Sequence, residues 1–563
     1  MRLILFLVSL SILAACADTS TVQPSGSAAD IQTAAEIKQP NVVVILADDV
    51  ALMDFGIYGG EAATPNIDAL ARRGMMFTNY HTSPMCAPSR AMLMTGLDSH
   101  RTGVPNLPIF LPSSYKTKPG YEGILSTDVT TLAEHLKAHD YRTYMTGKWN
   151  LGHTQTSLPS KRGFDRSFIL DASGADNYEQ RHYLPGQGEP PWFKDGKPAT
   201  LPDDFYSSRF LVDQMIEFMD EDKAANGSDA QAPFFAYISF QAIHIPVQVP
   251  RSFSEKYIST YDQGWQSIKE RRFENAKKLG LVNEQAELGN MLPALRSWDA
   301  LSPEQKDYAA KSMAVNAGMI EAMDFHIGRY VEYLKKTGEF ENTVFVITSD
   351  NGPEASDPSL LPGMTQWLEA TGYTMDYDTL GEEKSFTFIG PEFASAASGP
   401  SAFFKFYAGE GGLRVPLILS GPGVEQDMKS DAFSFVTDIT PTILDLVFTN
   451  TEAVNFDGRS LKTLTKGDAD YVYSEEDAIG MEAAAQAALF RGDYKITRNN
   501  PPYGDGQWRL YNLKKDPGET QDLAKTQPQL FYSLMSDYVD YAKDVGVLEM
   551  PEDYNAIHEV LKQ

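Results

Sequence analysis

Two runs of apolar, largely β-branched residues each lead into a pair of oxygen-rich side chains, and this pattern constrains the fold most. Residues 41–47 are followed by Asp48 and Asp49, and residues 342–349 are followed by Asp350 and Asn351. Uninterrupted runs of this kind are expected for strands buried on both faces of a parallel sheet. Because open α/β sheets place ligands at the carboxyl ends of such strands, the pattern predicts an α/β protein with a site at that edge.

The four residues that follow these strands have the chemistry of a metal site. Adjacent carboxylates repel each other, and a hard cation with oxygen ligands is their natural partner. An Asp-Asp pair most often marks a solvated turn. That interpretation is less suited to Asp48 and Asp49, because a predicted core strand leads directly into them. We therefore expect a Ca²⁺ site, with Mg²⁺ as the alternative, whose ligands are Asp48, Asp49, Asp350 and Asn351.

Cys86 is one of only two cysteines in the chain, and it precedes Ala-Pro-Ser-Arg. A nearby arginine favours a reactive thiolate, whereas a lone cysteine is more often a buried structural thiol. The five residues 86–90 resemble the modification signature of the formylglycine-dependent (type I) sulfatases. In that family an enzyme oxidises the cysteine to formylglycine, an aldehyde whose hydrate supplies the nucleophile.

Other segments resemble the same family, which belongs to the alkaline-phosphatase-like superfamily. The resemblance runs from about residue 40 to the C-terminus and is closest to bacterial arylsulfatases; it includes residues 64–79, 147–152, 349–352, 411–416 and 435–446. It implies an α/β fold in which helices sandwich a large, mostly parallel mixed sheet. A small C-terminal antiparallel sheet with a final helix is expected beside it.

The resemblance also implies roles for individual residues. Arg90 would hold the aldehyde hydrate, and Cys86, as formylglycine, would join the four metal ligands. Lys148 would grip a sulfate oxygen. His244 would contact the sulfate or the leaving oxygen, where an imidazole is suited to proton transfer. Lys405 would bind the bridging oxygen or a sulfate oxygen, while Arg414 is expected to anchor structure.

Residue 150 departs from the family pattern. Sulfatases usually have His in the Gly-Lys-Trp-His-Leu-Gly segment, where it helps eliminate sulfate, and this chain has Asn150. An amide can hydrogen-bond an anion but has no titratable proton near neutral pH, so base catalysis at this position is lost. His153, three residues later, is a substitute only if the loop carries it to the site; an unrelated surface histidine is the simpler reading.

The N-terminal segment suggests export and lipid anchoring. Residues 1–16 read as a lipoprotein signal peptide and lipobox, ending Leu-Ala-Ala-Cys, with Cys16 as the lipidated residue. An ordinary cleaved signal is the alternative. Residues 17–39 have the composition of a flexible tether. We expect a catalytic domain over 40–454 and a C-terminal α+β subdomain over 455–563, in the periplasm or cell envelope.

Secondary structure between the motifs is predicted more coarsely. Residues 251–301 are expected to be a peripheral insertion with helical spacing, residues 308–336 a helix, and residues 353–401 a long loop region. The C-terminal subdomain is expected to contain strands at 471–474, 488–491, 494–496 and 508–513 before its final helix.

Charge limits the partners. The chain has 563 residues and a formal net charge of −28, which argues against nucleic acid because phosphates require Lys and Arg. The expected partners are a small sulfate ester, the enzyme that generates formylglycine, and a membrane reached only through the lipid.

The function implied by the resemblance is hydrolysis of sulfate monoesters through a covalent sulfated intermediate on the formylglycine hydrate. One alternative is a phosphonate monoester or phosphodiester hydrolase of the same superfamily, a reading that the loss of histidine at position 150 favours. Another is a lipoprotein that binds sulfated ligands without turnover. The sequence carries no readable signal for the alcohol half of the substrate.

Overall fold

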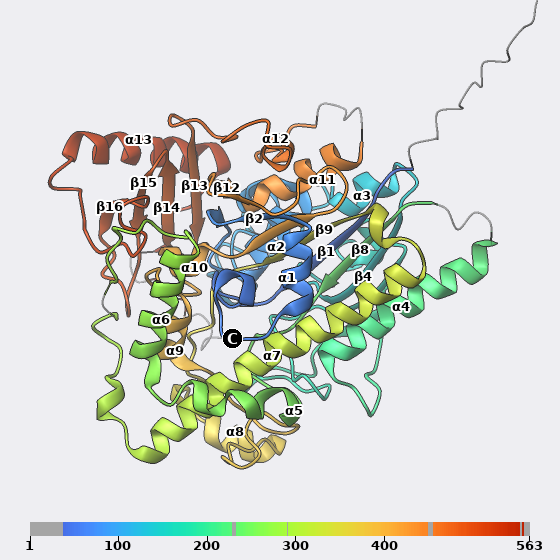
Figure 1. Ribbon diagram of the computed structural model, residues 1–563, viewed down its shortest axis with the longest axis horizontal. Coiled ribbons are helices and arrows are strands. Elements are labelled where there is room, and N and C mark those ends of the chain that lie inside the picture. The colour runs from blue at the N-terminus through green and yellow to red at the C-terminus, as the bar shows by residue number, and fades with distance from the viewer. Residues whose placement is uncertain are drawn as a thin grey trace, which may run out of the picture. The chain divides into compact units, whose positions relative to one another are not determined.

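The fold is built on one mixed sheet, seen in the centre of the computed structural model in Figure 1. The structure describes residues 38–227, 232–289, 291–448 and 454–551, together with Tyr554 and Ala556. Residues Gln39–Gln563 form one compact unit. The predicted signal peptide, Cys16 and nearly all of the tether lie outside the described residues.

Within the described residues the main sheet has ten strands in the order β11-β2-β10-β9-β1-β8-β4-β5-β6-β7. Neighbours from β9 to β5 are parallel, and β10 and β6 join them antiparallel. The bounds are β1 Asn41–Ala47, β2 Gly74–Phe77, β4 Arg142–Lys148, β5 Arg166–Leu170, β6 Trp192–Lys194, β7 Lys197–Pro198, β8 Phe234–Ser239, β9 Thr343–Ser349, β10 Leu417–Ser420 and β11 Met428–Ser430. A separate pair joins β3 (Tyr80–His81) to β12 (Ser434–Phe435).

Helices cover both faces of this sheet, as Figure 1 shows. Alternate residues of β1 enter opposite cores, Val43 and Ile45 one and Val42, Val44 and Leu46 the other, so both faces of the strand are apolar. The helices are α1 Pro65–Arg72, α2 Cys86–Thr95, α3 Leu132–Lys137, α4 Ser207–Asn226, α5 Arg251–Ser254, α6 Gly264–Lys278, α7 Pro303–Lys336, α8 Met364–Thr371, α9 Gly390–Ala397, α10 Glu410–Leu413, α11 Ile439–Val447, α12 Lys462–Thr465 and α13 Pro528–Val545. None of the described helices has the length and apolarity needed to cross a bilayer.

The C-terminal sheet is a four-stranded antiparallel meander, β13 (Ala478–Ala483), β14 (Gln486–Arg491), β15 (Tyr494–Arg498) and β16 (Trp508–Asn512). One face packs on α13 through Leu534 and Tyr538. Residues of its other face, Met481 and Phe490 among them, belong to the same core cluster as residues of the main sheet. The predicted fold class is therefore confirmed for both sheets.

Two of the coarser predictions about whole segments need correction. Residues 353–401 contain α8 and α9, because short apolar faces in this segment find partners: Met364 and Leu368 pack in one cluster and Phe393 in the main core. The stretch 251–301 is only partly peripheral, since α6 buries Trp265 and Phe273.

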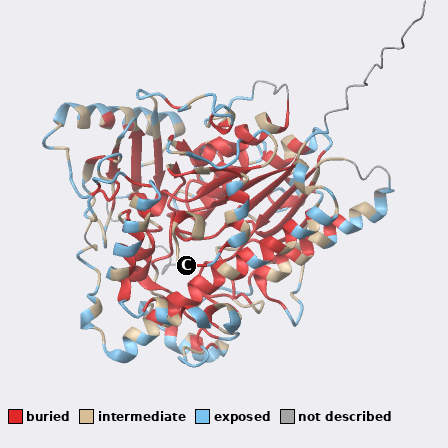
Figure 2. Cartoon of the chain, in the orientation of Figure 1, coloured by how far each residue is buried: buried red, intermediate tan, exposed pale blue. Residues whose placement is uncertain are grey.

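Two boundaries also differ. The strand expected at 471–474 is wrong, and the first strand of the C-terminal sheet is β13. The helix expected from residue 308 begins earlier, at Pro303. Ser302 caps it by accepting a hydrogen bond from the Gln305 backbone, and proline is well suited to a first helical position. Figure 2 shows the buried interior that these elements enclose.

Candidate active site

The centre of the site lies where β1 and β9 end side by side. These strands pair in parallel up to Ala47 and Ser349, so Asp48 and Asp49 emerge next to Asp350 and Asn351. The Asp49 amide donates to Asp350 Oδ1 at 3.3 Å, and Asn351 Nδ2 donates to Asp49 Oδ1 at 2.7 Å. All four side chains are buried. The structure thus brings together the four predicted oxygen ligands.

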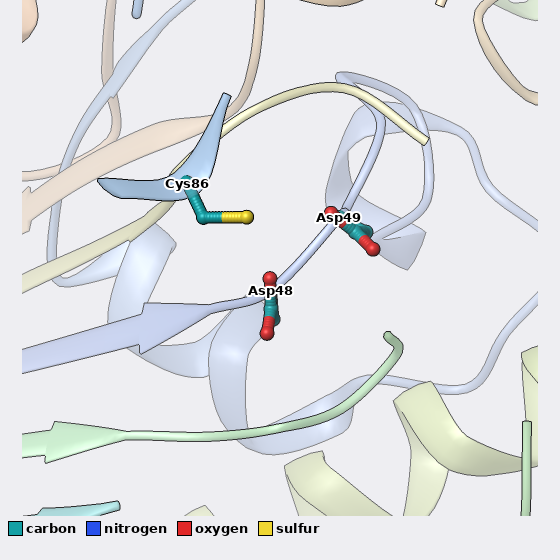
Figure 3. Close-up of side chains that lie close together, drawn as sticks. All are labelled: Asp48, Asp49 and Cys86. Atoms are coloured by element: carbon teal, nitrogen blue, oxygen red, sulfur yellow. The ribbon is translucent and has the colours of Figure 1, made fainter. Parts of the chain in front are cut away.

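Cys86 is the first residue of α2 and points toward the two aspartates, as Figure 3 shows. Its Sγ and single oxygens of Asp48 and Asp49 all lie within 4.8 Å of one another. Burial, only partly offset by Lys148 and Lys405, raises the pKa of the Cys86 thiol to about 11. This shift favours a neutral thiol for unmodified Cys86, in line with the buried-thiol reading rather than the reactive thiolate.

Arg90 and Lys148 form the cationic side around Asp48 and Asp350. Arg90 lies one turn after Cys86 on α2, which places both side chains on the same helix face. Its guanidinium donates to Asp350 Oδ2 from Nε at 2.8 Å, and to the Lys148 carbonyl and Ser239 hydroxyl from Nη1. Lys148, the last residue of β4, donates from Nζ to Asp48 Oδ2 at 2.6 Å. Both cations are fully buried.

Lys405 lies against the other aspartate. Its Nζ is 2.7 Å from Asp49 Oδ1 and 2.7 Å from Glu354 Oε2. Burial alone would lower the pKa of Lys405, but Asp49, Cys86 and Glu354 together raise it well above its ordinary value. Lys405 is therefore charged at neutral pH.

His244 lies near Glu354, on the same side of the site as Lys405. It follows β8, and its Nδ1 lies 2.6 Å from the Ile245 carbonyl, which orients the ring. Nε2 lies 4.0 Å from Glu354 Oε2. Burial, together with Lys405 and Lys148, lowers the pKa of His244 well below its ordinary value. The imidazole is therefore neutral in the free protein.

Two further contacts fix the His244 ring. Tyr183 meets it edge-on with ring centroids 5.2 Å apart. Gly174 lies so close that a Cβ there would come within 2.6 Å of Nδ1. The loop that follows β5 therefore packs directly on the imidazole.

The residues present fit a bound divalent cation. Asp48 Oδ1 and Asn351 Oδ1 are buried and have no hydrogen-bond partner among the described residues. Burial and the charge of Asp350 raise the pKa of Asp48 well above its ordinary value. An unpaired buried carboxylate oxygen is costly unless a cation meets it, and oxygen ligands of this kind suit Ca²⁺ or Mg²⁺.

Asn150 and His153 differ in what they contact. Asn150 adopts a left-handed backbone conformation, with φ of 56°, and its buried Oδ1 has no hydrogen-bond partner in the described part of the chain. His153 instead places Nδ1 2.8 Å from Asp171 Oδ2, and its side chain is 57% exposed. The hydrogen bond to Asp171 raises the pKa of His153. The structure gives His153 no contact with Cys86 or with the buried lysines.

Two polar partners in the site were not predicted from the sequence. Glu354 binds Lys405, and Ser239 joins Arg90 to the Lys148 carbonyl. The signal for Glu354 was its place three residues after Asn351, directly beyond a strand end. Arg414 donates to the Thr78 and Leu281 carbonyls, contacts that fit the expected structural role.

Comparison with known proteins places these observations in a family. The model of the sulfatase family matches residues 40–449. An uncharacterised sulfatase of Schizosaccharomyces pombe is 36% identical over 550 residues, covering 93% of this chain and 97% of that protein. An arylsulfatase of Klebsiella aerogenes is 35% identical over 417 residues, covering 73% and 87%.

Solved structures agree in fold. Ps i-CgsB in complex with k-i-k-neocarrahexaose superposes with a TM-score of 0.63 at 23% identity, covering 93% of this chain and 96% of that chain. BT4656 in complex with its substrate D-glucosamine-2-N,6-O-disulfate gives a TM-score of 0.62 at 20% identity, covering 92% and 100%.

Proposed function

The chain belongs to the sulfatase family, and we propose that it hydrolyses sulfate monoesters to an alcohol or phenol and inorganic sulfate. The observation that carries the proposal is the meeting of Arg90, Lys148 and Lys405 with buried oxygen ligands around Cys86. Such a site offers positive charge to a sulfuryl group whose negative charge spreads over three oxygens.

The groups that the family supplies are formylglycine and a divalent cation. Formylglycine made from Cys86 would provide the attacking hydroxyl. A cation held by Asp48, Asp49, Asp350 and Asn351, with the modified Cys86, would provide positive charge beside the attacking and sulfuryl oxygens. We favour Ca²⁺, with Mg²⁺ as the alternative.

The chain's own cations then bind and orient the sulfate group. Arg90 is held by Asp350 and Ser239 and lies next to Cys86 on α2, so it fixes the position of the modified side chain. Lys148 and Lys405 approach from opposite halves of the site and donate to sulfate oxygens. Because all of these groups are buried, their charges act with little screening by water.

His244 is the proposed proton donor to the leaving oxygen. In the free protein it is neutral because burial, together with Lys405 and Lys148, lowers its pKa. An anionic sulfate ester adds negative charge beside the ring and raises its proton affinity. The ring then takes up a proton from water at Nε2, because Nδ1–H is held by the Ile245 carbonyl, and it passes that proton to the leaving oxygen. Lys405 supports this step by hydrogen bonding to the same oxygen.

The first test is the mass of the peptide that contains Cys86, in protein made together with a formylglycine-generating enzyme. We expect loss of one sulfur and two hydrogens and gain of one oxygen, followed by turnover of nitrophenyl sulfate. An ordinary thiol would overturn the covalent route and favour a protein that binds sulfated ligands.

A phosphonate monoester or phosphodiester hydrolase is the second candidate, and Asn150 in place of histidine is the observation that favours it. Comparison of kcat/KM on nitrophenyl sulfate and phenyl phosphonate esters separates the two. We expect the sulfate ester to be preferred by at least tenfold. A preference for the phosphonate would replace the proposed function.

The metal is tested by thermal melting of protein stripped of cations. Added Ca²⁺ should raise the Tm of the wild type and leave the Asn351→Ala variant nearly unchanged, because that variant loses an unpaired ligand oxygen. A shift of equal size in both proteins would contradict the assignment.

We further propose export and lipid anchoring through Cys16, on the strength of the Leu-Ala-Ala-Cys sequence. In a bacterial host, wild-type protein should fractionate with membranes and carry a lipid on its N-terminal peptide. The Cys16→Ser variant should be found without lipid; identical fractionation of both would contradict the anchor.

A further inference from the structure

The loop that follows β1 carries two of the predicted metal ligands, and its backbone has an unusual conformation. Asp49 is left-handed, with φ of 68°. A residue other than glycine adopts this conformation at a cost, and it persists where the surrounding structure fixes it. The loop therefore needs anchors close to the metal ligands.

Three consecutive backbone amides of this loop each donate to a buried side chain. The amides of residues 49 and 50 donate to side chains at the end of β9, at 3.3 Å and 2.9 Å. The Ala51 amide donates to Asp54 Oδ2 at 2.7 Å, and the Asp54 amide donates back to the Ala51 carbonyl. Asp54 belongs to the same loop, so it is an anchor only because something outside the loop holds it.

Arg272 of α6 holds Asp54. Its Nη1 donates to Asp54 Oδ1 at 2.7 Å and to the carbonyl of Ala397, the last residue of α9, at 2.8 Å. Its Nε and Nη2 donate to Glu61 Oε2 at 3.1 Å and 2.6 Å. The Arg272 and Asp54 side chains are both buried. Asp54 thus gives one oxygen to the loop and the other to the guanidinium.

The arrangement requires an arginine. One planar guanidinium reaches two carboxylates and the end of a helix, which a lysine ammonium cannot do. Breaking a buried ion pair destabilises the fold, so support of folding is the simplest role of this pair. Its place argues for a second role, because the connection from Arg272 through Asp54 ends at an amide two residues after a metal ligand.

We propose that Arg272 is a positioning residue for the metal ligand Asp49, a role that rests on the metal site of the proposed function. Arg272 acts from the stretch 251–301, which the sequence predicts to be peripheral, through Asp54 and the Ala51 amide. Without this hold the loop after β1 leaves its left-handed turn, and the cation is bound more weakly.

Calorimetric titration with Ca²⁺ alone tests this role, in protein made together with a formylglycine-generating enzyme and stripped of cations. Residues that orient metal ligands contribute about 10- to 100-fold to affinity. We expect Arg272→Lys to weaken Ca²⁺ binding by about tenfold or more. Arg271→Lys is the matched control, because Arg271 is 42% exposed and contacts Glu61 at 3.4 Å rather than Asp54. The control should bind Ca²⁺ as the wild type does.

Asp54→Asn separates the loop from the other contacts of Arg272. The amide oxygen can still accept from Ala51, but the amide nitrogen cannot accept from the guanidinium, while Glu61 and Ala397 keep their bonds. This variant should also bind Ca²⁺ about tenfold more weakly. Because both changes break the same connection, their effects should not add in the double variant. Additive losses would contradict a path through Asp54.

Thermal melting of the cation-free proteins separates positioning from support of folding. A pair that only supports folding would lower the Tm and leave the Ca²⁺ affinity of the folded protein unchanged, and that result would overturn the inference. If Arg272→Lys is unfolded at the assay temperature, Asp54→Asn decides, since it keeps the pair between Arg272 and Glu61.

Binding by the wild type separates this inference from the proposed function. A wild type that binds neither Ca²⁺ nor Mg²⁺ would remove the metal from the proposed function. Equal Ca²⁺ affinity in the wild type and both folded variants, with turnover of nitrophenyl sulfate intact, would overturn the role of Arg272 and leave the function standing.

Discussion

Each buried cationic side chain of the site has a carboxylate partner. These pairs leave some oxygens of the predicted metal ligands with a hydrogen bond and others without one. Lys148 takes Asp48 Oδ2 and leaves Asp48 Oδ1 without a hydrogen bond. Asn351 gives its amide nitrogen to Asp49 and leaves its oxygen unpaired. At Asp48, Lys148 and a metal ion would therefore contact different oxygens, and Arg90 Nη2 lies 3.8 Å from the oxygen left to the metal. Asp49 differs, because Lys405 Nζ lies within 3.0 Å of both of its oxygens.

Replacing Glu354 with Gln should lower kcat/KM for nitrophenyl sulfate by about 10- to 100-fold, or about 1.4 to 2.7 kcal/mol. The amide cannot hold the Lys405 ammonium as a carboxylate does, so Lys405 loses its fixed position. Ser356→Ala is the matched control, because Ser356 also bonds Glu354 but does not contact Lys405. A similar loss in both variants would mean a general disturbance of the loop.

The Asn150→His variant should release sulfate faster, by about tenfold, if the step that lacks a base limits turnover. A left-handed backbone conformation tolerates histidine nearly as well as asparagine. Stopped-flow measurement would show a smaller burst relative to the steady-state rate. No increase would show that another group already acts as the base, and His153→Ala should then distinguish His153 from water.

At the scale of elements, the loops that follow β5 and β8 determine the orientation of His244. A Cβ at Gly174 would meet the imidazole at 2.6 Å from Nδ1, whereas a Cβ at Gly188 would meet nothing within 4 Å. The position of the imidazole therefore depends on the absence of a side chain at Gly174.

Gly174→Ala should reduce kcat/KM by about 10- to 100-fold because a displacement of about 1 Å costs catalysis on this scale. Far-UV circular dichroism should remain that of the wild type, since the change affects only a loop. Gly188→Ala should keep full activity. Full activity of the Gly174 variant would show that the ring can shift without consequence.

The strands that frame the site were predictable because their residues carry the signal locally. Residues 42–47 are apolar, residues 343–349 are mainly apolar or β-branched, and both runs lead into acidic residues, a pattern typical of buried parallel strands. Cys86, Arg90, Lys148, His244 and Lys405 came from resemblance to known motifs, and the structure brings all five together.

The rest of the site depends on tertiary contacts that no short window of sequence contains. Glu354 is one of several acidic residues in a stretch with Gly, Pro and Ser throughout, and its role arises only when the chain returns 51 residues later with Lys405. The helices α8 and α9 have eight residues each, too few to be stable without packing partners.

At the scale of the whole molecule, a buried group of charges joins the C-terminal sheet to α10 and to β3 of the two-stranded pair. Lys495 of β15 donates to Glu410 Oε1 at 2.9 Å and to Glu519 Oε1 at 2.8 Å, and His81 of β3 lies 3.0 Å from Glu410 Oε2. Glu410 begins α10, five residues after Lys405. The C-terminal sheet therefore supports the segment that carries a candidate catalytic lysine.

Lys495→Met should lower the free energy of unfolding by about 3 to 5 kcal/mol, because two buried carboxylates lose their cation. Urea unfolding followed by fluorescence measures this change. Lys514→Met is the control: Lys514 is 68% exposed and lies 4.0 Å from Asp493, and exposed pairs contribute about 1 kcal/mol or less. Equal losses would contradict a structural role for the buried group.

Stability should also depend on pH through Glu519. Burial, outweighing the effect of Lys495, raises the pKa of Glu519 from 4.5 to about 7. Between these values the folded protein holds a proton that the unfolded chain has lost. The contribution is complete below about pH 4.5 and is lost as the pH rises through 7.

The measurement is the difference in free energy of unfolding between wild type and Glu519→Gln, followed from pH 5 to pH 8. We expect the wild type to become less stable relative to the variant as the pH rises. Glu475→Gln, an exposed control, should show a constant difference. A constant difference for Glu519→Gln would contradict the shifted pKa.

The charges between the sheets also restrict how this chain can be recombined with a relative. A crossover near residue 455, where the sequence pattern changes, would separate Glu410 from Lys495 and Glu519. Unless the incoming half supplied matching charges, Glu410 would be buried without its ammonium partner. Segments exchanged between such proteins should therefore carry α10 together with the C-terminal sheet, which makes the inherited unit larger than that sheet alone.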